Sequence, residues 1–150
     1  MAGPVVQTSA FLTLDSGDGG GAVDCSGSFG SFAPAVMRAA VEAGTLDGDI
    51  VRNIPGLNTV ECPATLRQDG DLVVLKRLMV AMFGRVRVTF VFRSQDASQS
   101  GTNPTMTVKG YVLKVPFTGA RGEIIGGELQ MTFDYFSWAD GTTTLSAGVA

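Results

Sequence analysis

The sequence contains no histidine, and this absence narrows the chemistry open to the chain. Histidine is the usual general base near neutral pH and the commonest ligand of transition metals, so both kinds of site lose their first candidate. Cysteine is also scarce, because Cys25 and Cys62 are too few for a disulfide scaffold and lack the spacing of a zinc site. We therefore predict that the chain is not an enzyme and has no catalytic, metal or cofactor site.

Charge is sparse as well, since charged residues make up 17% of the chain and the formal net charge is −3. An acidic balance with scattered lysines and arginines disfavours a protein that grips nucleic acid by neutralising phosphates. The sequence has no uninterrupted apolar run of about 18 residues, the length that a membrane-spanning helix needs. Residues 1–10 carry no lysine or arginine ahead of their apolar residues, unlike a secretory signal. We expect synthesis in the cytoplasm and no membrane insertion.

The composition favours a β-rich domain that associates with other subunits. A chain of 150 residues is long enough for one domain, which buries roughly two thirds of its unfolded surface. Twenty glycines suggest many turns between short strands. The hydrophobic content of 45% leaves more apolar exterior than a monomer usually shows. We predict a single domain over residues 1–150, with part of its surface covered by partner subunits.

Alternation of apolar and polar residues predicts most of the strands. Residues 11–14 and 22–29 form an expected hairpin around the glycine-rich residues 15–21. Period-two patterns mark further strands at 85–93 and 128–136. Further strands are expected at 59–67, where Pro63 indicates an edge or a bulge, and at 106–117, where Gly110 indicates a bulge or bend.

One helix is predicted over Leu72–Phe83, with Asp71 as its N-cap and Gly84 just past its end as C′. Its apolar residues extend nearly all round, so we expect it to pack on a sheet and on a neighbour. Residues 34–43 also have local helical preferences. The ends, residues 1–10 and 139–150, are predicted to be flexible unless a partner orders them.

Other patterns that could indicate a catalytic or binding site have simpler structural explanations. The pairs Asp47/Asp49 and Asp69/Asp71 lie beside glycines, as turn residues do. The glycine run at 17–21 lacks the Gly-Lys-Ser/Thr ending of a phosphate-binding loop. We assign none of them a catalytic or binding role.

The two cysteines and two aromatic residues near the C-terminus are the remaining candidates for a functional role. Cys25 and Cys62 fall on predicted strands, where a lone thiol is usually a small buried hydrophobe. A disulfide within the chain or between neighbours stays open at this point. Phe136 and Trp138, near a strand end, are candidate interface anchors.

Four features in order resemble the tube proteins of contractile phage tails and related injection machines. They are a loop ending in Arg52-Asn-Ile-Pro-Gly56, a strand ending in Thr65-Leu-Arg67, the turn Gly70-Asp-Leu72 that opens a single helix, and three closing strands. The resemblance covers roughly residues 22–138.

The resemblance implies a fold and an assembly. The fold is mainly β, a small antiparallel β-sandwich or barrel with one flanking α-helix, and residues 34–43 form an extended strand rather than a helix. Six copies form a ring with a continuous inner β-barrel, in which edge strands are paired and so protected. Rings stack into a tube through an inter-ring contact loop, whose residues are Gly44, Leu46, Asp47, Asp49, Arg52, Ile54, Pro55 and Gly56.

The function that the resemblance implies is structural, as the tail tube of a virion. The implied partners are copies of this chain, a tail sheath protein, and a tape measure protein and DNA that pass through an acidic lumen without specific binding. A close alternative is the inner tube of a phage-derived injection or type VI secretion system. The alternative from another class is a β-sandwich binding module or a capsid decoration protein.

Overall fold

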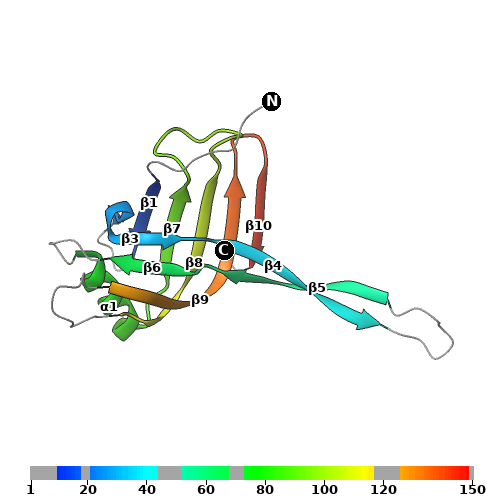
Figure 1. Cartoon of the computed structure of the whole chain (residues 1–150), viewed down its shortest axis with the longest axis horizontal. Helices are drawn as coiled ribbons and strands as arrows, with labels where there is room; N and C mark the ends of the chain where they lie inside the picture. The colour runs from blue at the N-terminus through cyan, green and yellow to red at the C-terminus, as the bar shows by residue number, and fades with distance from the viewer. Residues whose placement is uncertain (1–9, 18–20, 44–51, 68–72, 117–125, 149–150) are drawn as a thin grey trace.

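A computed structural model describes residues 10–17, 21–43, 52–67, 73–116 and 126–148, and this part of the chain is mainly antiparallel β with one α-helix (Figure 1). The elements are β1 (Phe11–Asp15), β2 (Ala22–Asp24), the 3-10 helix η1 (Ser26–Ser28), β3 (Phe29–Phe32), β4 (Ala35–Ala43), β5 (Arg52–Glu61), β6 (Ala64–Arg67), α1 (Val73–Gly84), β7 (Val88–Arg93), β8 (Thr105–Lys114), β9 (Gly126–Ala139) and β10 (Thr144–Gly148). The predicted fold class, an antiparallel β structure with one flanking helix, is confirmed for a single copy of the chain.

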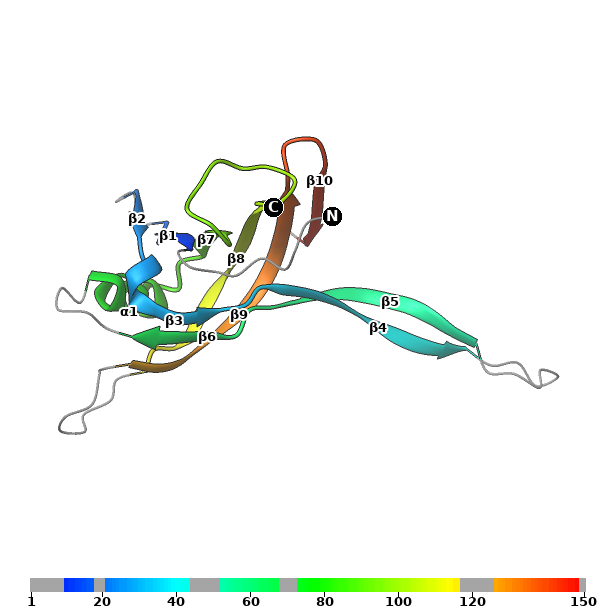
Figure 2. The same cartoon turned by 45° about the horizontal axis from the view of Figure 1, so that its top comes forward.

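Eight of the described strands form one curled sheet, a half-barrel, in the order β2-β1-β7-β8-β9-β6-β3, with β10 also paired to β9. The long strand β9 pairs with β6 at its beginning and with β10 at its end. β4 and β5 form a separate two-stranded ribbon that extends well beyond the sheet (Figures 1 and 2).

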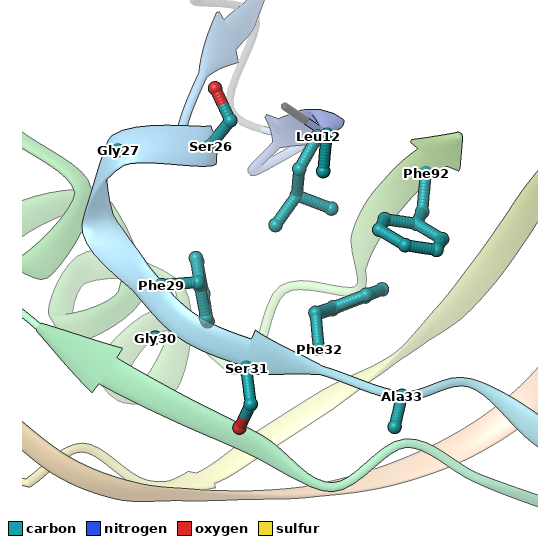
Figure 3. A pocket seen from close by; sticks show the side chains of 10 residues that line it. Leu12, Ser26, Gly27, Phe29, Gly30, Ser31, Phe32, Ala33 and Phe92 are labelled. Carbon is teal, nitrogen blue, oxygen red and sulfur yellow. The ribbon is translucent and has the colours of Figure 1, made fainter. Parts of the chain in front are cut away.

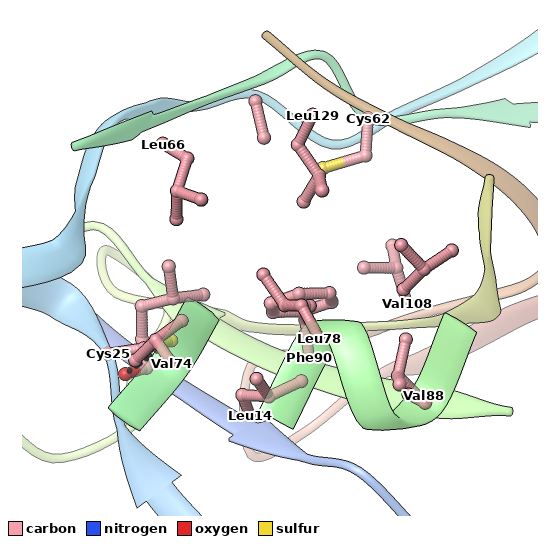
Figure 4. Close-up of a cluster of buried hydrophobic side chains, with 14 of the residues drawn as sticks. Leu14, Cys25, Cys62, Leu66, Val74, Leu78, Val88, Phe90, Val108 and Leu129 are labelled. Carbon is pink, nitrogen blue, oxygen red and sulfur yellow. Dashed lines mark hydrogen bonds between the residues drawn. The ribbon is translucent and has the colours of Figure 1, made fainter. Parts of the chain in front are cut away.

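The core lies on the concave face of the sheet and follows from the period-two pattern. Val88, Phe90 and Phe92 of β7 are buried, while the residues between them are half-buried. α1 closes the core from one side with Val74, Leu75, Leu78 and Ala81, which share one helical face. Figure 4 shows Val74 and Leu78 of the helix against labelled residues of β1, β6, β7, β8 and β9.

Two expectations stood for residues 34–43, a helix from local preference and a strand from the resemblance, and the ribbon shows which one holds. Their local helical preference does not prevail, because Ala35–Ala43 is strand β4 along its whole length, paired antiparallel with β5. This confirms the strand that the resemblance implied. Strand pairing supplies hydrogen bonds that override a weak local preference.

The prediction of a loop over residues 44–56 is wrong for residues 52–56. Residues 52–56 belong to β5, and Pro55 pairs with Ala40. The register shifts between Arg38 and Ala40, which places one extra residue on β5 and bends the ribbon as a β-bulge does. A proline is tolerated there because a two-stranded ribbon leaves each strand one unpaired edge. Residues 44–51 lie outside the described part.

The predicted strand over 59–67 is divided at Cys62 and Pro63. β5 ends at Glu61 in the ribbon, and β6 begins at Ala64 in the curled sheet. Proline has no amide hydrogen for a ladder, so the chain changes from one sheet to the other at Pro63. The sequence signal was correct in position, since Pro63 was expected to mark an edge or a bulge.

The ends of α1 differ partly from the prediction. Asp71 and Leu72 lie outside the described residues. Gly84 is the last helical residue, and the left-handed position after the helix falls on Arg85, with φ of 54°. The predicted C′ residue is therefore displaced by one position.

The C-terminal part contains a strand that was not expected, because residues 139–150 were predicted to be flexible. β10 pairs with β9 across a turn at Asp140 and Gly141. The Asp140 carboxylate accepts hydrogen bonds from the amides of Thr142 and Thr143. An Asp-Gly pair is a strong hairpin signal, and it was available in the sequence.

Candidate assembly surfaces

The distinctive features of the described part of the chain are uncovered surfaces. Within it, no group of three or more His, Cys, Asp or Glu side chains gathers to hold a metal ion. None of its helices is long and apolar enough to cross a membrane. The surfaces that follow are the ribbon, the two faces of the sheet and the outer face of α1.

The ribbon presents apolar side chains on both of its faces near the point where it leaves the sheet. Val36 and Met37 are neighbours in β4, so they point to opposite faces, and both are exposed. Arg38 is fixed by a hydrogen bond from its Nε to Asn58 Oδ1 at 2.9 Å. A two-stranded ribbon alone is marginally stable, so these exposed apolar groups indicate a surface that a partner covers.

The concave face of the sheet carries an apolar row that runs across five strands. The register aligns its members as direct cross-strand neighbours: Leu12, Phe92, Met106, Trp138 and Leu145. Exposure rises along this row, from 2% at Leu12 to 59% at Leu145 on β10. The end of the apolar row over β9 and β10 therefore lacks cover within the described chain.

A hollow of about 640 Å³ opens beside the buried end of the apolar row (Figure 3). Phe29 and Phe32 of β3 face Leu12 and Phe92 across it. Phe32 and Phe92 have ring centroids 5.5 Å apart. No lining residue of this hollow is titratable, so it has no acid or base to offer a reaction.

The opposite, convex face of the sheet is rich in hydroxyl groups. One row across the same five strands consists of Thr13, Val91, Thr107, Ser137 and Ser146, and is called the hydroxyl row below. The cations on this face lie over aromatic rings, with Arg93 at 3.9 Å from the Phe11 centroid and Lys109 at 5.0 Å from that of Tyr135. The face thus offers weak polar contacts and few free charges.

The outer face of α1 is apolar and exposed. Val73, Met79, Val80 and Phe83 are exposed, and the Phe83 side chain is 76% exposed. On the inner side, Arg77 Nη1 donates a 2.8 Å hydrogen bond to the carbonyl of Gly21 and so ties the helix to the start of β2. The helix therefore packs on the sheet on one side and leaves an apolar stripe on the other.

The sequence-predicted site residues are distributed over different parts of the fold. Four of the eight inter-ring loop residues lie outside the described residues, and the other four, Arg52, Ile54, Pro55 and Gly56, lie in β5. Phe136 and Trp138 are half-buried on the concave face of β9, and Trp138 belongs to the apolar row. Sequence reasoning missed Leu145, because it did not predict β10.

Cys25 and Cys62 are free thiols, each buried in the core. The disulfide that the sequence left open between them is not formed in this structure. Burial raises the pKa of each thiol to about 12, and the carboxylate of Asp24 adds to the effect at Cys25. Cys25 Sγ also donates to the carbonyl of Leu12.

We expect neither cysteine to react with a thiol reagent such as DTNB at pH 8 in the native protein. A thiol with a pKa of about 12 is only about 0.01% thiolate at that pH, and both side chains are also inaccessible. Both should react at once in guanidinium chloride. Because the folded pKa is raised, the thiols contribute stability below pH 9 that is lost between pH 9 and about 12. Rapid labelling of one native thiol would contradict the buried placement.

No protein-family model matches the sequence, and no curated protein matches it. Among solved structures, the fold is similar to a chain of the anti-feeding prophage (AFP) baseplate, whose cryo-EM structure is 6-fold symmetrised. The two share 10% sequence identity with a TM-score of 0.55, and the similarity covers 99% of each chain. At this identity, the similarity shows that the fold is shared.

Proposed function

We propose that this chain is a structural subunit of a phage-tail-type assembly, and that it forms the tail tube. In this proposal residues 1–150 are a single tail-tube domain, six copies form a ring, and rings stack into a tube. The observation that carries the proposal is the end-to-end similarity to a chain of a 6-fold symmetrised prophage baseplate. The shared fold alone is an argument by analogy, so the surfaces of this chain must support it independently.

The uncovered surfaces support assembly over a monomeric binding module. A half-barrel with free edges, an apolar row that ends in an exposed leucine, and exposed apolar residues where the ribbon leaves the sheet are liabilities in a monomer. Pairing with further copies would cover all three. The alternative of a binding module or capsid decoration protein predicts a ligand face, and the hollow beside the apolar row offers no charged group to a ligand.

The convex face suits the bore of such a tube. The core and α1 lie on the concave side of the run β2-β1-β7-β8-β9-β10, and the rest of the sheet, β6 and β3, curls toward that side (Figure 2). Closing this run into an inner barrel therefore leaves the hydroxyl row toward the lumen. DNA and a tape measure protein could pass this surface without specific binding, because Arg93 and Lys109 are engaged with aromatic rings. In this proposal the described part of the lumen face is hydroxylated and carries few free charges.

The remaining roles follow from the same geometry. The ribbon and residues 44–56 would contact the next ring, Phe136 and Trp138 would anchor a neighbouring copy, and a tail sheath protein would surround the tube. The assembly would form in the host cytoplasm and reside in the virion tail. The similarity to a prophage baseplate supports equally a variant in which the same ring forms the inner tube of a phage-derived injection apparatus.

Electron microscopy and analytical ultracentrifugation of the purified protein over a range of concentrations test this proposal. We expect six-membered rings and, at high concentration, hollow tubes. A chain that stays monomeric at every concentration, also after addition of preformed tail baseplates as initiators, would contradict it.

A variant with a shortened ribbon tests whether the ribbon is needed for stacking rings into tubes and not for forming the rings. Replacing residues 39–57 by Asn-Gly keeps Arg38 and Asn58 as a cross-strand pair and closes the shortened hairpin with a favoured two-residue turn. We expect this variant to retain the melting temperature and the rings of the parent, but to form no tubes. Tubes of normal length from this variant would exclude the ribbon as the stacking element.

A further inference from the structure

Within the sheet, the six-stranded run β2-β1-β7-β8-β9-β10 has a free edge at each of its two ends among the described residues (Figure 2). Among the described residues, β2 pairs on one side with β1 and β10 pairs on one side with β9. An edge strand presents a row of unpaired amides and carbonyls, which is a template for pairing with another chain.

Neither edge carries the lysines or prolines that commonly protect an edge strand, although β2 is only three residues long. Residues 22–24 and 144–148 contain no lysine, arginine or proline. The one charged residue among them, Asp24, accepts hydrogen bonds from the hydroxyl and amide of Ser26, which also lower its pKa. Natural proteins generally place charges, prolines or bulges on edges that must stay free, so both of these edges are suited to pairing.

The directions of the strands allow one edge to pair with the other. All five neighbouring pairs in the run are antiparallel. Because the run contains an even number of strands, β2 and β10 point in opposite directions. Placing β10 of one copy beside β2 of the next, in the same orientation, therefore continues the antiparallel alternation.

The side chains on the concave face also continue across such a junction. The apolar row ends at the exposed Leu145. The row beside it starts on β2 and ends on β10, and consists of Val23, Leu14, Phe90, Val108, Phe136 and Ala147. A second β2 edge at β10 would bring Val23 of the next copy beside Leu145 and Ala147 and cover them.

We propose that the ring of this protein is closed by an antiparallel seam between β10 of one copy and β2 of the next. The inference rests on the proposed ring, and it assigns the two edges that join. The contact is heterologous, so each copy uses both edges, and repeated rotation about one axis closes the ring. Pairing of β10 with β10, or of β2 with β2, would instead give a two-fold dimer.

Cross-linking on the assembled protein tests the seam. Ala22 and Ser146 are both exposed and both lie on the convex face. Within one chain they are separated by five strand spacings, about 24 Å, which is beyond a short bis-maleimide. Cys25 and Cys62 are buried, so the parent protein serves as a blank.

The double variant Ala22→Cys/Ser146→Cys should give a ladder of covalent oligomers up to the hexamer. A mixture of the two single variants should give dimers, and each single variant alone should give none. Ala22→Cys paired with Ser98→Cys, in the exposed loop before β8, is the matched control and should stay uncross-linked.

The outcomes distinguish a failure of the proposed seam from a failure of the proposed ring. Rings without the ladder, or dimers from one single variant, would overturn the seam while the proposed function stands. Protein that forms neither rings nor cross-links would overturn both.

Independently, Leu145→Lys should weaken assembly by about tenfold or more, because a seam would bury its charge. Leu113→Lys, at a site 61% exposed on β8 and outside the seam, should weaken it less.

Discussion

Gly110→Ala is expected to lower the free energy of unfolding by about 3 kcal/mol, which corresponds to a fall in melting temperature of about 10 °C. Gly110 lies in β8 where the register against β9 shifts, so the two backbones approach closely. A β-carbon added there would overlap the carbonyl of Thr132 and lie 2.9 Å from the Cα of Phe133. Both contacts are backbone, so the strands themselves must separate.

Gly101→Ala is the matched control for this substitution. Gly101 lies in the loop between β7 and β8, and a β-carbon there meets no atom within 4 Å. We expect its free energy of unfolding to stay within about 0.5 kcal/mol of the parent. Equal denaturant midpoints for Gly110→Ala and the parent would show that β8 and β9 are spaced more widely than described here.

Phe90→Ala should lower the free energy of unfolding by about 4 kcal/mol, and part of the protein should lose its fold at 37 °C. Phe90 is fully buried in β7. Its ring lies 5.8 Å from that of Phe29 and 5.2 Å from that of Phe32, so it packs β7 against β3, the strand at the far end of the same curled sheet. Removing the ring leaves a cavity at this junction as well as the loss of buried apolar area.

Phe83→Ala removes the same ring from an exposed position on α1 and serves as the control. We expect a change below about 0.5 kcal/mol when both variants are measured by urea unfolding at a concentration at which they are monomeric. Similar losses for the two variants would contradict the assignment of Phe90 to the core. If Phe83→Ala impaired assembly without changing the stability of the monomer, the apolar stripe of α1 would be part of an interface.

The sequence predicted that the chain has surfaces for subunit contact, but it did not predict where all of them lie. The apolar composition and the edge signal at Pro63 indicated subunit contacts. Trp138, named from the sequence as a candidate interface anchor, is half-buried in the apolar row, and its role as an anchor stays a prediction. Leu145 was missed because the tail was expected to be flexible, although the Asp140-Gly141 pair is a hairpin signal. The loop expected over residues 44–56 extended too far, because residues 52–56 pair with β4 and belong to β5, and its contact with the next ring stays a prediction.

The sequence by itself determined the local elements, because their signals lie within a few residues. Alternation at Val88–Arg93 and in β9 defined strands, the apolar run before Gly84 defined the single helix, and the lack of histidine disfavoured most catalytic sites. Only the tertiary structure decided which strands become edges, where the ribbon leaves the sheet and which end of the apolar row is uncovered. These properties depend on pairing between segments far apart in the chain, such as β1 with β7, whose register and burial no local pattern specifies.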